Sequence, residues 1–506
     1  MSASREKKLR QDQTASGYVD PKAEKELEKK KAEKRSNVLY SVIAVLFVLV
    51  VAASFLWRSN VISRNATALT IDGEKYSAAE VNFYYQNVYR GFLQSNSYFI
   101  SYLGLDTNAS LKSQTVNATA ASMMGVEEGS SWHDYIMDNT VKQMTMVQRG
   151  LKQAQEEGYQ FPASVQEQYE DSLNSLKTSA ESTGMSVKAY LQRNLGAIMT
   201  EKVYNQQVLR MLQYQAYAQS YSDSLTYTDA ELEAAYQADP KTYDKAAWEY
   251  VVVSGAADST TDADGNTVQA TAEEILAAYN SGKSLESIAG NYEKATYYNT
   301  TDATYYDGVV GNWLFDDARK DGDTEILEVG TNYYVGLFHS RGREEYKTVD
   351  IRHILITPET GTKAQGDEGY EDEQTQLKAA ARTKAEEILA QWKSGEATED
   401  SFAQLAMENS ADGSKYDGGL YTRVTKGWAV EEFNDWCFDA SRKDGDTGIV
   451  DTTYGSHVMY FVGYDLPAWA ASVTSDLQEK AASEWSTALS ENADVQQSDF
   501  GMKFVG

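Results

Sequence analysis

The sequence predicts an α+β protein with a transmembrane helix, a mainly α-helical domain and two related α+β domains. Three observations support this prediction: an uncharged apolar run of 20 residues, a long segment with helical spacing of apolar residues, and an internal repeat. At 506 residues the chain is also too long for one core. The predicted parts are a basic tail at 1–37, a transmembrane helix at 38–57, a helical domain at 58–240 completed by 467–506, and α+β domains at 245–340 and 345–465.

The composition excludes several classes of protein. The formal net charge is −29, so a nucleic-acid partner is not expected. The charge is uneven, because residues 1–37 hold eleven Lys/Arg against seven Asp/Glu. Cys437 is the single cysteine, which excludes a disulfide within the chain and a Cys-based metal site. With only four histidines, no metal or other cofactor is expected.

The apolar run at 38–57 is predicted to anchor the chain in a membrane. Its 20 uncharged residues can cross a ~30 Å hydrocarbon layer as a helix. Lys34 and Arg35 precede it, so the positive-inside rule places the tail in the cytoplasm and everything after Trp57 outside. The prediction is therefore a single-pass cell-membrane protein with one helix in the lipid bilayer. The rival interpretation is a cleaved signal peptide, which would have a shorter apolar stretch and a shorter basic head.

The segment at 58–240 is predicted to be mainly helical. A short hairpin centred on Asp72-Gly73 precedes it, and Ser77 to Glu80 forms a capping box that opens a helix. Thr228 to Glu231 is a second capping box. Because the last forty residues return to helical spacing, we expect the tail to fold back on this domain.

The middle of the chain contains a duplicated unit. AEEILAAYNSG at 272–282 matches AEEILAQWKSG at 385–395 in eight of eleven positions. GNWLFDDARKDGDT at 311–324 matches NDWCFDASRKDGDT at 434–447 in nine of fourteen. In both copies a strand comes first, helices follow, and a turn and a final strand close the unit, which is typical of a small α+β domain.

The two copies differ where chemistry could occur. His353 of the second copy aligns with Tyr250 of the first, and His457 aligns with Tyr334. The Gly-Gly turn in YDGGLYT at 416–422 is also confined to the second copy. A purely structural histidine pair would more often be shared by both copies or absent from both. The asymmetry therefore predicts a functional site in the second copy.

The second copy resembles the parvulin-type peptidyl-prolyl isomerases. RHILI at 352–356, YDGGLYT, GWAVEEFNDWCFD at 427–439 and GDTGIVDTTYGSHVMYF at 445–461 are similar to that family's motifs, in the same order. The whole layout resembles bacterial extracytoplasmic foldases of the PrsA and SurA type. In those proteins a helical chaperone domain, made from both chain ends, accompanies one or more parvulin domains.

The resemblance implies roles for particular residues. His353, Asp412 and His457 are expected in the catalytic site. The residues expected to bind the substrate are Leu420, Trp428, Ala429, Phe433 and Tyr454. Ala429 departs from the family, because it takes the pocket position usually held by Met. The pocket is then wider, unless Trp428 refills it.

The function implied by the resemblance is cis–trans isomerisation of X-Pro peptide bonds in unfolded or partly folded exported proteins. The alternative is a non-catalytic, membrane-tethered holding chaperone in which both copies are inactive. The first copy, which lacks both histidines, is expected to be a degenerate parvulin-like domain without isomerase activity. A homodimer is an arrangement that the sequence leaves open.

Overall fold

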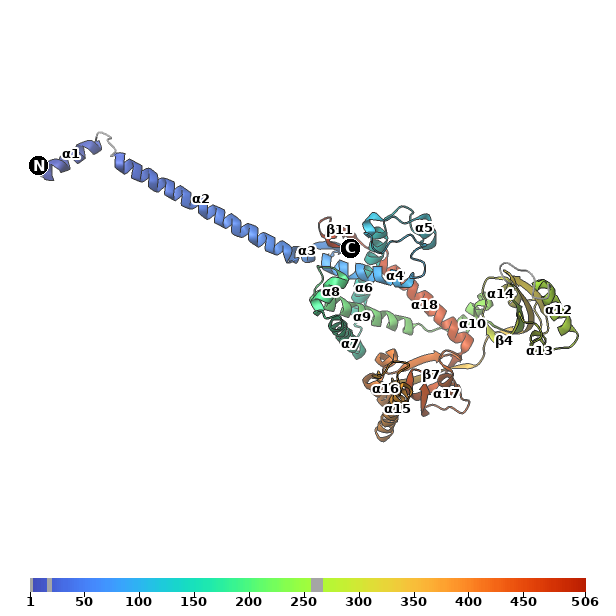
Figure 1. Cartoon of the computed structure of the whole chain (residues 1–506). Helices are drawn as coiled ribbons and strands as arrows, with labels where there is room; N and C mark the ends of the chain where they lie inside the picture. Colours follow the sequence, from blue (N-terminus) through green and yellow to red (C-terminus); the bar gives the residue numbers. More distant parts are fainter. Residues whose placement is uncertain (1–2, 16–20, 256–266) are drawn as a thin grey trace. The chain divides into compact units, whose positions relative to one another are not determined.

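The computed structural model describes residues 3–15, 21–255 and 267–506. It divides into two compact units: 1–152 with 171–211 and 489–506, and 153–170 with 212–488. The helices outside the two sheet domains are α1 Ala3–Ala15, α2 Pro21–Arg58, α3 Val61–Asn65, α4 Ala78–Ser95, η1 Leu111–Ser113, α5 Ala118–Met124, α6 Trp132–Glu156, α7 Ala163–Ser182, α8 Val187–Leu195, α9 Glu201–Ser224, α10 Asp229–Ala238, α11 Pro240–Tyr243, α18 Ala468–Ser490 and η3 Gly501–Phe504 (Figure 1).

The predicted hairpin opens the first unit. Strands β1 (Thr67–Ile71) and β2 (Glu74–Ser77) pair antiparallel. The two turn residues, Asp72 and Gly73, have φ angles of 49° and 84°, which is the pattern of a tight hairpin turn. Ser77 and Glu80 then form the predicted capping box at the start of α4, and Thr228 and Glu231 form the second one at α10.

The tail of the chain completes this small sheet. Strand β11 (Val495–Gln497) pairs with β1, so the sheet order is β11-β1-β2. Leu69 lies opposite Gln497 although more than 400 positions separate them. The tail of the chain therefore does return to the first unit, through the pairing of residues 495–497 with β1. The bounds 58–240 and 467–506 of the helical domain stay a prediction.

The predicted membrane segment lies within α2, which is one continuous helix (Figure 1). Among the described residues, no helix meets the length and apolarity needed to cross a membrane. The predicted span at 38–57 also includes positions 38–40, 53, 56 and 57, whose side chains lie outside the described set. The prediction of a transmembrane helix is thus not supported by the structure.

The two copies of the repeat fold into sheets with the same topology. The first sheet has the order β4-β3-β6-β5 and the second the order β8-β7-β10-β9, and every neighbouring pair is antiparallel. The strands are β3 Lys245–Val253, β4 Ala295–Ala303, β5 Thr324–Val329, β6 Asn332–Gly342, β7 Lys347–Ile356, β8 Leu420–Val424, β9 Thr447–Thr452 and β10 Gly455–Pro467.

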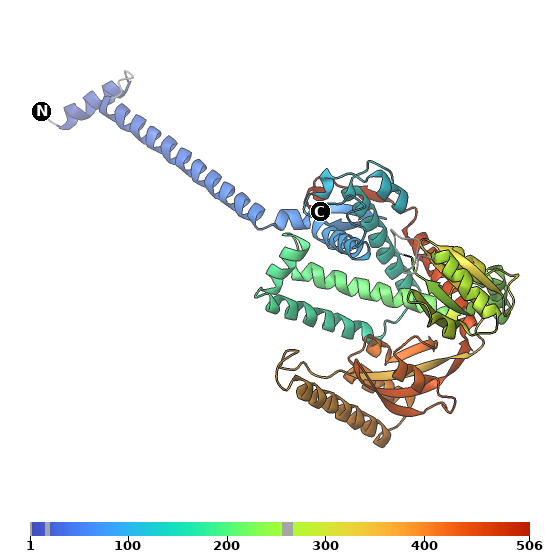
Figure 2. The same ribbon diagram turned by 45° about the vertical axis from the view of Figure 1, so that its right-hand side comes forward.

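Each sheet carries helices on both faces. In the first domain these are α12 Val268–Asn280, α13 Leu285–Ala289 and α14 Val309–Leu314; in the second they are α15 Tyr370–Ser394, α16 Glu399–Asn409, η2 Gly413–Asp417 and α17 Glu431–Cys437 (Figure 2). Ile354 and Val458 pack under α15 and α16, whereas Ile351 and Met459 pack under α17 with the buried Cys437. The period-2 alternation of strand residues produces these two cores.

Candidate active site

Two buried histidines meet on neighbouring strands of the second sheet. His353 on β7 and His457 on β10 are 2% and 5% exposed. The Nδ1 atoms lie 3.1 Å apart, and the two rings stack with centroids 5.3 Å apart. His353 lies opposite Met459, which is two residues from His457. Because residues two apart on a strand share a face, both histidine side chains lie on the face of the sheet that α17 covers.

A loop beside β7 brings Asp412 to this pair. Ser410 Oγ accepts the amide of Leu355 at 3.0 Å, and the amide of Ala411 donates to the Leu355 carbonyl at 2.8 Å. Farther along, the amide of His353 donates to Gly419 O at 2.9 Å. Gly419 has a φ of 75°, and a Cβ there would lie 2.3 Å from His353 O. The second glycine of the Gly-Gly turn is therefore required for this close approach.

The Asp412 carboxylate accepts hydrogen bonds from several directions. Its Oδ1 lies 3.2 Å from His353 Nε2, 2.8 Å from the Tyr421 hydroxyl, and 2.9 and 2.5 Å from the amide and hydroxyl of Ser414. The bond from His353, helped by those from Ser414 and Tyr421, holds the pKa of Asp412 well below its ordinary value, although burial acts the other way. Asp412 is therefore a fixed negative charge at neutral pH.

The carboxylate fixes the direction of a proton chain. A carboxylate only accepts, so His353 Nε2 must carry a proton. In the tautomer with this single proton, His353 Nδ1 accepts from His457 Nδ1. The Nε2 of His457 then accepts from the Thr452 hydroxyl, 2.9 Å away. The order Thr452–His457–His353–Asp412 gives every ring nitrogen a partner, and His353 Nε2 also lies 3.2 Å from the Ser414 hydroxyl, so neither buried imidazole has an unsatisfied polar atom.

Burial keeps the second histidine neutral. Burial and, to a smaller extent, the neighbouring His353 lower the pKa of His457 to about 4, against the opposing effect of Asp412 and Asp451. Burial also raises the pKa of the Tyr421 phenol to about 12, with a contribution from its bond to Asp412. The site thus contains the Asp412 carboxylate, a neutral His457 imidazole and a neutral Tyr421 phenol at physiological pH. Among the described residues, no three His, Cys, Asp or Glu side chains are grouped to hold a metal ion.

Comparison with known proteins agrees with this geometry. The family model described as the PPIC-type PPIase domain matches residues 335–462, which include β7 to β9, the first part of β10 and the whole histidine network. The chain carries a parvulin-type domain. The family match begins within β6 of the first sheet, so the domain bounds 345–465 stay a prediction.

The proteins to which the chain is similar include a foldase and a SurA-like chaperone. This chain is 29% identical over 142 residues to Foldase protein PrsA 1 of Listeria innocua. The matched segment covers 27% of this chain and 39% of that protein. Among solved structures, PrsA from Bacillus subtilis is 14% identical, with 74% of this chain and 93% of the other covered and a TM-score of 0.28. A SurA-like chaperone of Campylobacter jejuni is 13% identical, with 84% and 93% covered and a TM-score of 0.18. Over the matched segment the chain is similar to PrsA, and this segment spans about two fifths, 39%, of the length of the curated relative.

Aromatic side chains form a wall over the imidazoles of the parvulin domain. Phe433 on α17 is 3% exposed and meets both rings edge-on, with centroids 5.5 Å from His353 and 5.3 Å from His457. Trp428 is 51% exposed, and its ring lies 4.7 Å from Tyr421 and 6.3 Å from Phe433. Ala429 packs against the same core as Phe433, and its side chain fills less space there than a Met side chain would. Trp428 borders the space that is left.

Two of the predicted substrate-binding residues lie apart from this wall. Leu420 is cross-strand to Arg352, and it is the next residue, Tyr421, whose ring lies 5.4 Å from His353. Tyr454 is 64% exposed in the β9–β10 turn, where its amide donates to Thr452 Oγ1. The hydroxyls that contact the histidines are those of Thr452 and Ser414, and not that of Tyr454.

Sequence reasoning missed Ser414, Tyr421 and Thr452. For Tyr421, the alternation of faces along a strand was a usable signal, because neighbouring residues such as Leu420 and Tyr421 take opposite faces. For Ser414, the Asp-x-Ser spacing typical of an Asx turn was available. Nothing in the sequence singled out Thr452 among several nearby hydroxyl residues.

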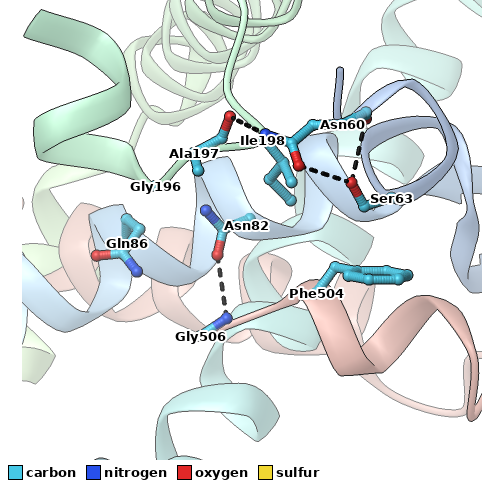
Figure 3. A pocket seen from close by; sticks show the side chains of 9 residues that line it. All are labelled: Asn60, Ser63, Asn82, Gln86, Gly196, Ala197, Ile198, Phe504 and Gly506. Atoms are coloured by element: carbon cyan, nitrogen blue, oxygen red, sulfur yellow. Dashed lines mark hydrogen bonds between the residues drawn. The ribbon is translucent and has the colours of Figure 1, made fainter. Parts of the chain in front are cut away.

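A separate cavity lies in the first unit (Figure 3). Its volume is about 260 Å³, and its most buried polar side chain, Asn82, donates to Leu195 O at 2.5 Å and accepts from the Gly506 amide at 3.0 Å. The carboxamide is satisfied within the protein, and no titratable side chain lines the cavity, so it offers no acid–base chemistry. The lining residues are Asn60, Ser63, Asn82, Gln86, Gly196, Ala197, Ile198, Phe504 and Gly506.

Proposed function

We propose that the chain is an extracytoplasmic foldase that catalyses cis–trans isomerisation of X-Pro bonds in exported polypeptides. His353, Asp412 and His457 form its catalytic network. The observation that carries the proposal is the ordered chain from Thr452 to Asp412 beneath the Phe433 ring. The network is buried and its hydrogen-bonding groups are paired, so its charges and dipoles are held in place before the substrate binds. A site that stabilises a transition state electrostatically requires such pre-organisation.

The chemistry needs no covalent step. Rotation about an X-Pro amide is limited by a barrier of about 18–20 kcal/mol that comes from amide resonance. Phe433, with Trp428 at the rim, would hold the proline ring, and Asp412 would lie near the preceding carbonyl. Twisting the amide removes negative charge from that oxygen, so a fixed carboxylate opposes the planar amide more than the twisted one. The site then binds the transition state in preference to either isomer.

The alternative is a holding chaperone without catalysis, and Ala429 is the observation that favours it. A smaller side chain at this position gives a proline ring fewer contacts. The half-exposed Trp428 supports the first reading, because its ring borders the same region.

Proline-limited refolding separates the two functions. We expect catalytic amounts of the chain to accelerate the slow refolding phase of a small protein that waits on one X-Pro isomerisation, a step that otherwise takes tens of seconds or more. An unchanged slow phase with reduced aggregation would leave only the holding function.

We also propose that residues 38–57 attach the chain to a membrane. The exposed large side chains from Val42 to Val51 are apolar and between 45% and 68% exposed, and such a surface needs an apolar environment. We expect the full chain to stay in the membrane pellet after carbonate extraction, and a chain that starts at residue 58 to be released. Release of both chains to the same extent would refute the anchor.

A further inference from the structure

The first sheet domain places tyrosines where the parvulin domain has its histidines. In each domain, the two side chains that are compared lie on the two central strands of the sheet, and these strands pair in the same register. The matching cross-strand pairs are Tyr250 with Gly336 and Val252 with Tyr334 in the first domain, and His353 with Met459 and Leu355 with His457 in the second. Tyr250 and Tyr334 therefore occupy the positions of His353 and His457.

These tyrosines belong to a stacked cluster. The rings of Tyr250 and Tyr334 lie 5.8 Å apart at an interplanar angle of 28°, close to the arrangement of the histidine pair. On its other sides Tyr250 stacks on Tyr298 at 5.0 Å and on Trp248 at 4.0 Å. Offset stacking of this kind builds a rigid surface of aromatic rings.

A smaller helix residue leaves room for the larger rings. The matched motifs align Val310 of α14 with Phe433 of α17. Val310 is 3% exposed in a core against which Tyr250 and Tyr334 pack. The exchange of Phe for Val on the helix therefore accompanies the exchange of imidazole for phenol on the strands.

Four phenols of this cluster converge and face outward. Tyr298 and Tyr306 are 46% and 53% exposed, and Tyr250 and Tyr334 are half-buried. Burial raises the pKa of Tyr250, and the neighbouring phenols of Tyr298, Tyr334 and Tyr306 raise it further. Within the part of the chain that the structure describes, no hydrogen bond joins any of these four hydroxyls to another residue. We call Tyr250, Tyr298, Tyr306 and Tyr334 the tyrosine cluster.

The chemistry of the tyrosine cluster matches one class of ligand. Flat aromatic faces beside outward hydroxyls suit a polyproline II segment, whose rings pack on aromatics and whose carbonyls accept hydrogen bonds. The domain at 245–340 holds sixteen Asp/Glu and five Lys/Arg, a net formal charge of −11. Asp302 and Asp307 lie exposed in the chain on either side of Tyr306. Charge complementarity therefore favours a segment with basic residues.

We infer that the tyrosine cluster is a second, non-catalytic binding site for proline-rich segments flanked by Lys or Arg. Without the histidines and without an equivalent of Asp412 beside them, the site holds the peptide in one backbone form and does not twist the amide. The inference goes beyond the proposed isomerase, because it concerns the other copy of the repeat.

Fluorescence anisotropy with the full chain tests the inference. The probe is a labelled peptide of six prolines with two lysines at each end. Because Tyr298 and Tyr306 are exposed, replacing both with alanine should keep the fold, and we expect roughly tenfold weaker binding from two lost aromatic contacts. The matched control is Tyr464→Ala, a change at a residue that is 47% exposed and lies outside the cluster, which should bind as the wild type does.

Two further peptides sharpen the test. Replacing the prolines with alanines, or the lysines with glutamates, should weaken binding to the wild type and remove the difference between wild type and the double variant. Equal affinity of the wild type and the double variant for the lysine–proline peptide would overturn the inference. The isomerase rate of the double variant should equal that of the wild type, so failure of this site and failure of the catalytic proposal give separate results.

Discussion

Replacing Asp412 with alanine is expected to lower kcat/KM for an X-Pro peptide roughly 100-fold, the loss typical of removing one pre-organised electrostatic group. The substitution takes away the fixed charge beside the carbonyl. It also leaves His353 Nε2 without its strongest acceptor, so the direction of the proton chain is no longer fixed. The measurement is the steady-state rate of cis-to-trans conversion of a short X-Pro peptide by the full chain.

The chain offers a matched control for this variant. Asp439 accepts the amide and hydroxyl of Ser441 at 2.8 and 2.7 Å, as Asp412 accepts those of Ser414. Asp439→Ala removes the same kind of turn contact without touching a histidine, so its kcat/KM should stay at the wild-type value. Equal loss in both variants would mean that Asp412 acts only by holding its turn.

The parvulin domain is expected to lose stability as the pH falls from 6.5 to about 4. His457 has an ordinary pKa of 6.5, and its pKa in the folded chain is about 4. The unfolded state therefore takes up a proton through this window before the folded state does, and protons favour unfolding. The stability is fully present above pH 6.5, and the difference in pKa corresponds to a loss of about 3 kcal/mol by pH 4.

The readout must be local, because burial also lowers the pKa of His133 in the other unit. We would measure the urea dependence of hydrogen exchange for the β10 amides at pH 7 and pH 4.5. His457→Asn should flatten the pH dependence even where it lowers stability at pH 7. The folded-state pKa of Asp412 is lowered from 3.8, so its effect on stability appears below this window. A wild-type β10 that is equally stable at both pH values would contradict the assignment of a neutral, buried His457.

The internal repeat allowed much of the fold to be predicted. Aligning the two copies placed His353 against Tyr250 and His457 against Tyr334, and the strand registers agree with that alignment. The hairpin at Asp72-Gly73 and both capping boxes were also predictable, because each depends on a few adjacent residues.

Features that depend on distant contacts or on one-residue offsets were not predictable. The pairing of β11 with β1 involves three residues whose partners lie at the other end of the chain. Within the segment predicted to be mainly helical, α8 ends before Gly196, where φ is 91°, and α9 begins at Glu201. Tyr421 rather than Leu420 faces His353, because Tyr421 pairs with Ile351 on the face of His353, whereas Leu420 pairs with Arg352 on the other face.

Exchange NMR on a labelled X-Pro peptide tests the central claim most directly. With the intact chain present, we predict cross-peaks between the cis and trans resonances at mixing times far shorter than the tens of seconds of the uncatalysed reaction, and their disappearance in Asp412→Ala. Absence of exchange in the presence of the folded wild-type chain would contradict the claim that the histidine–aspartate network of the parvulin domain is a working isomerase site.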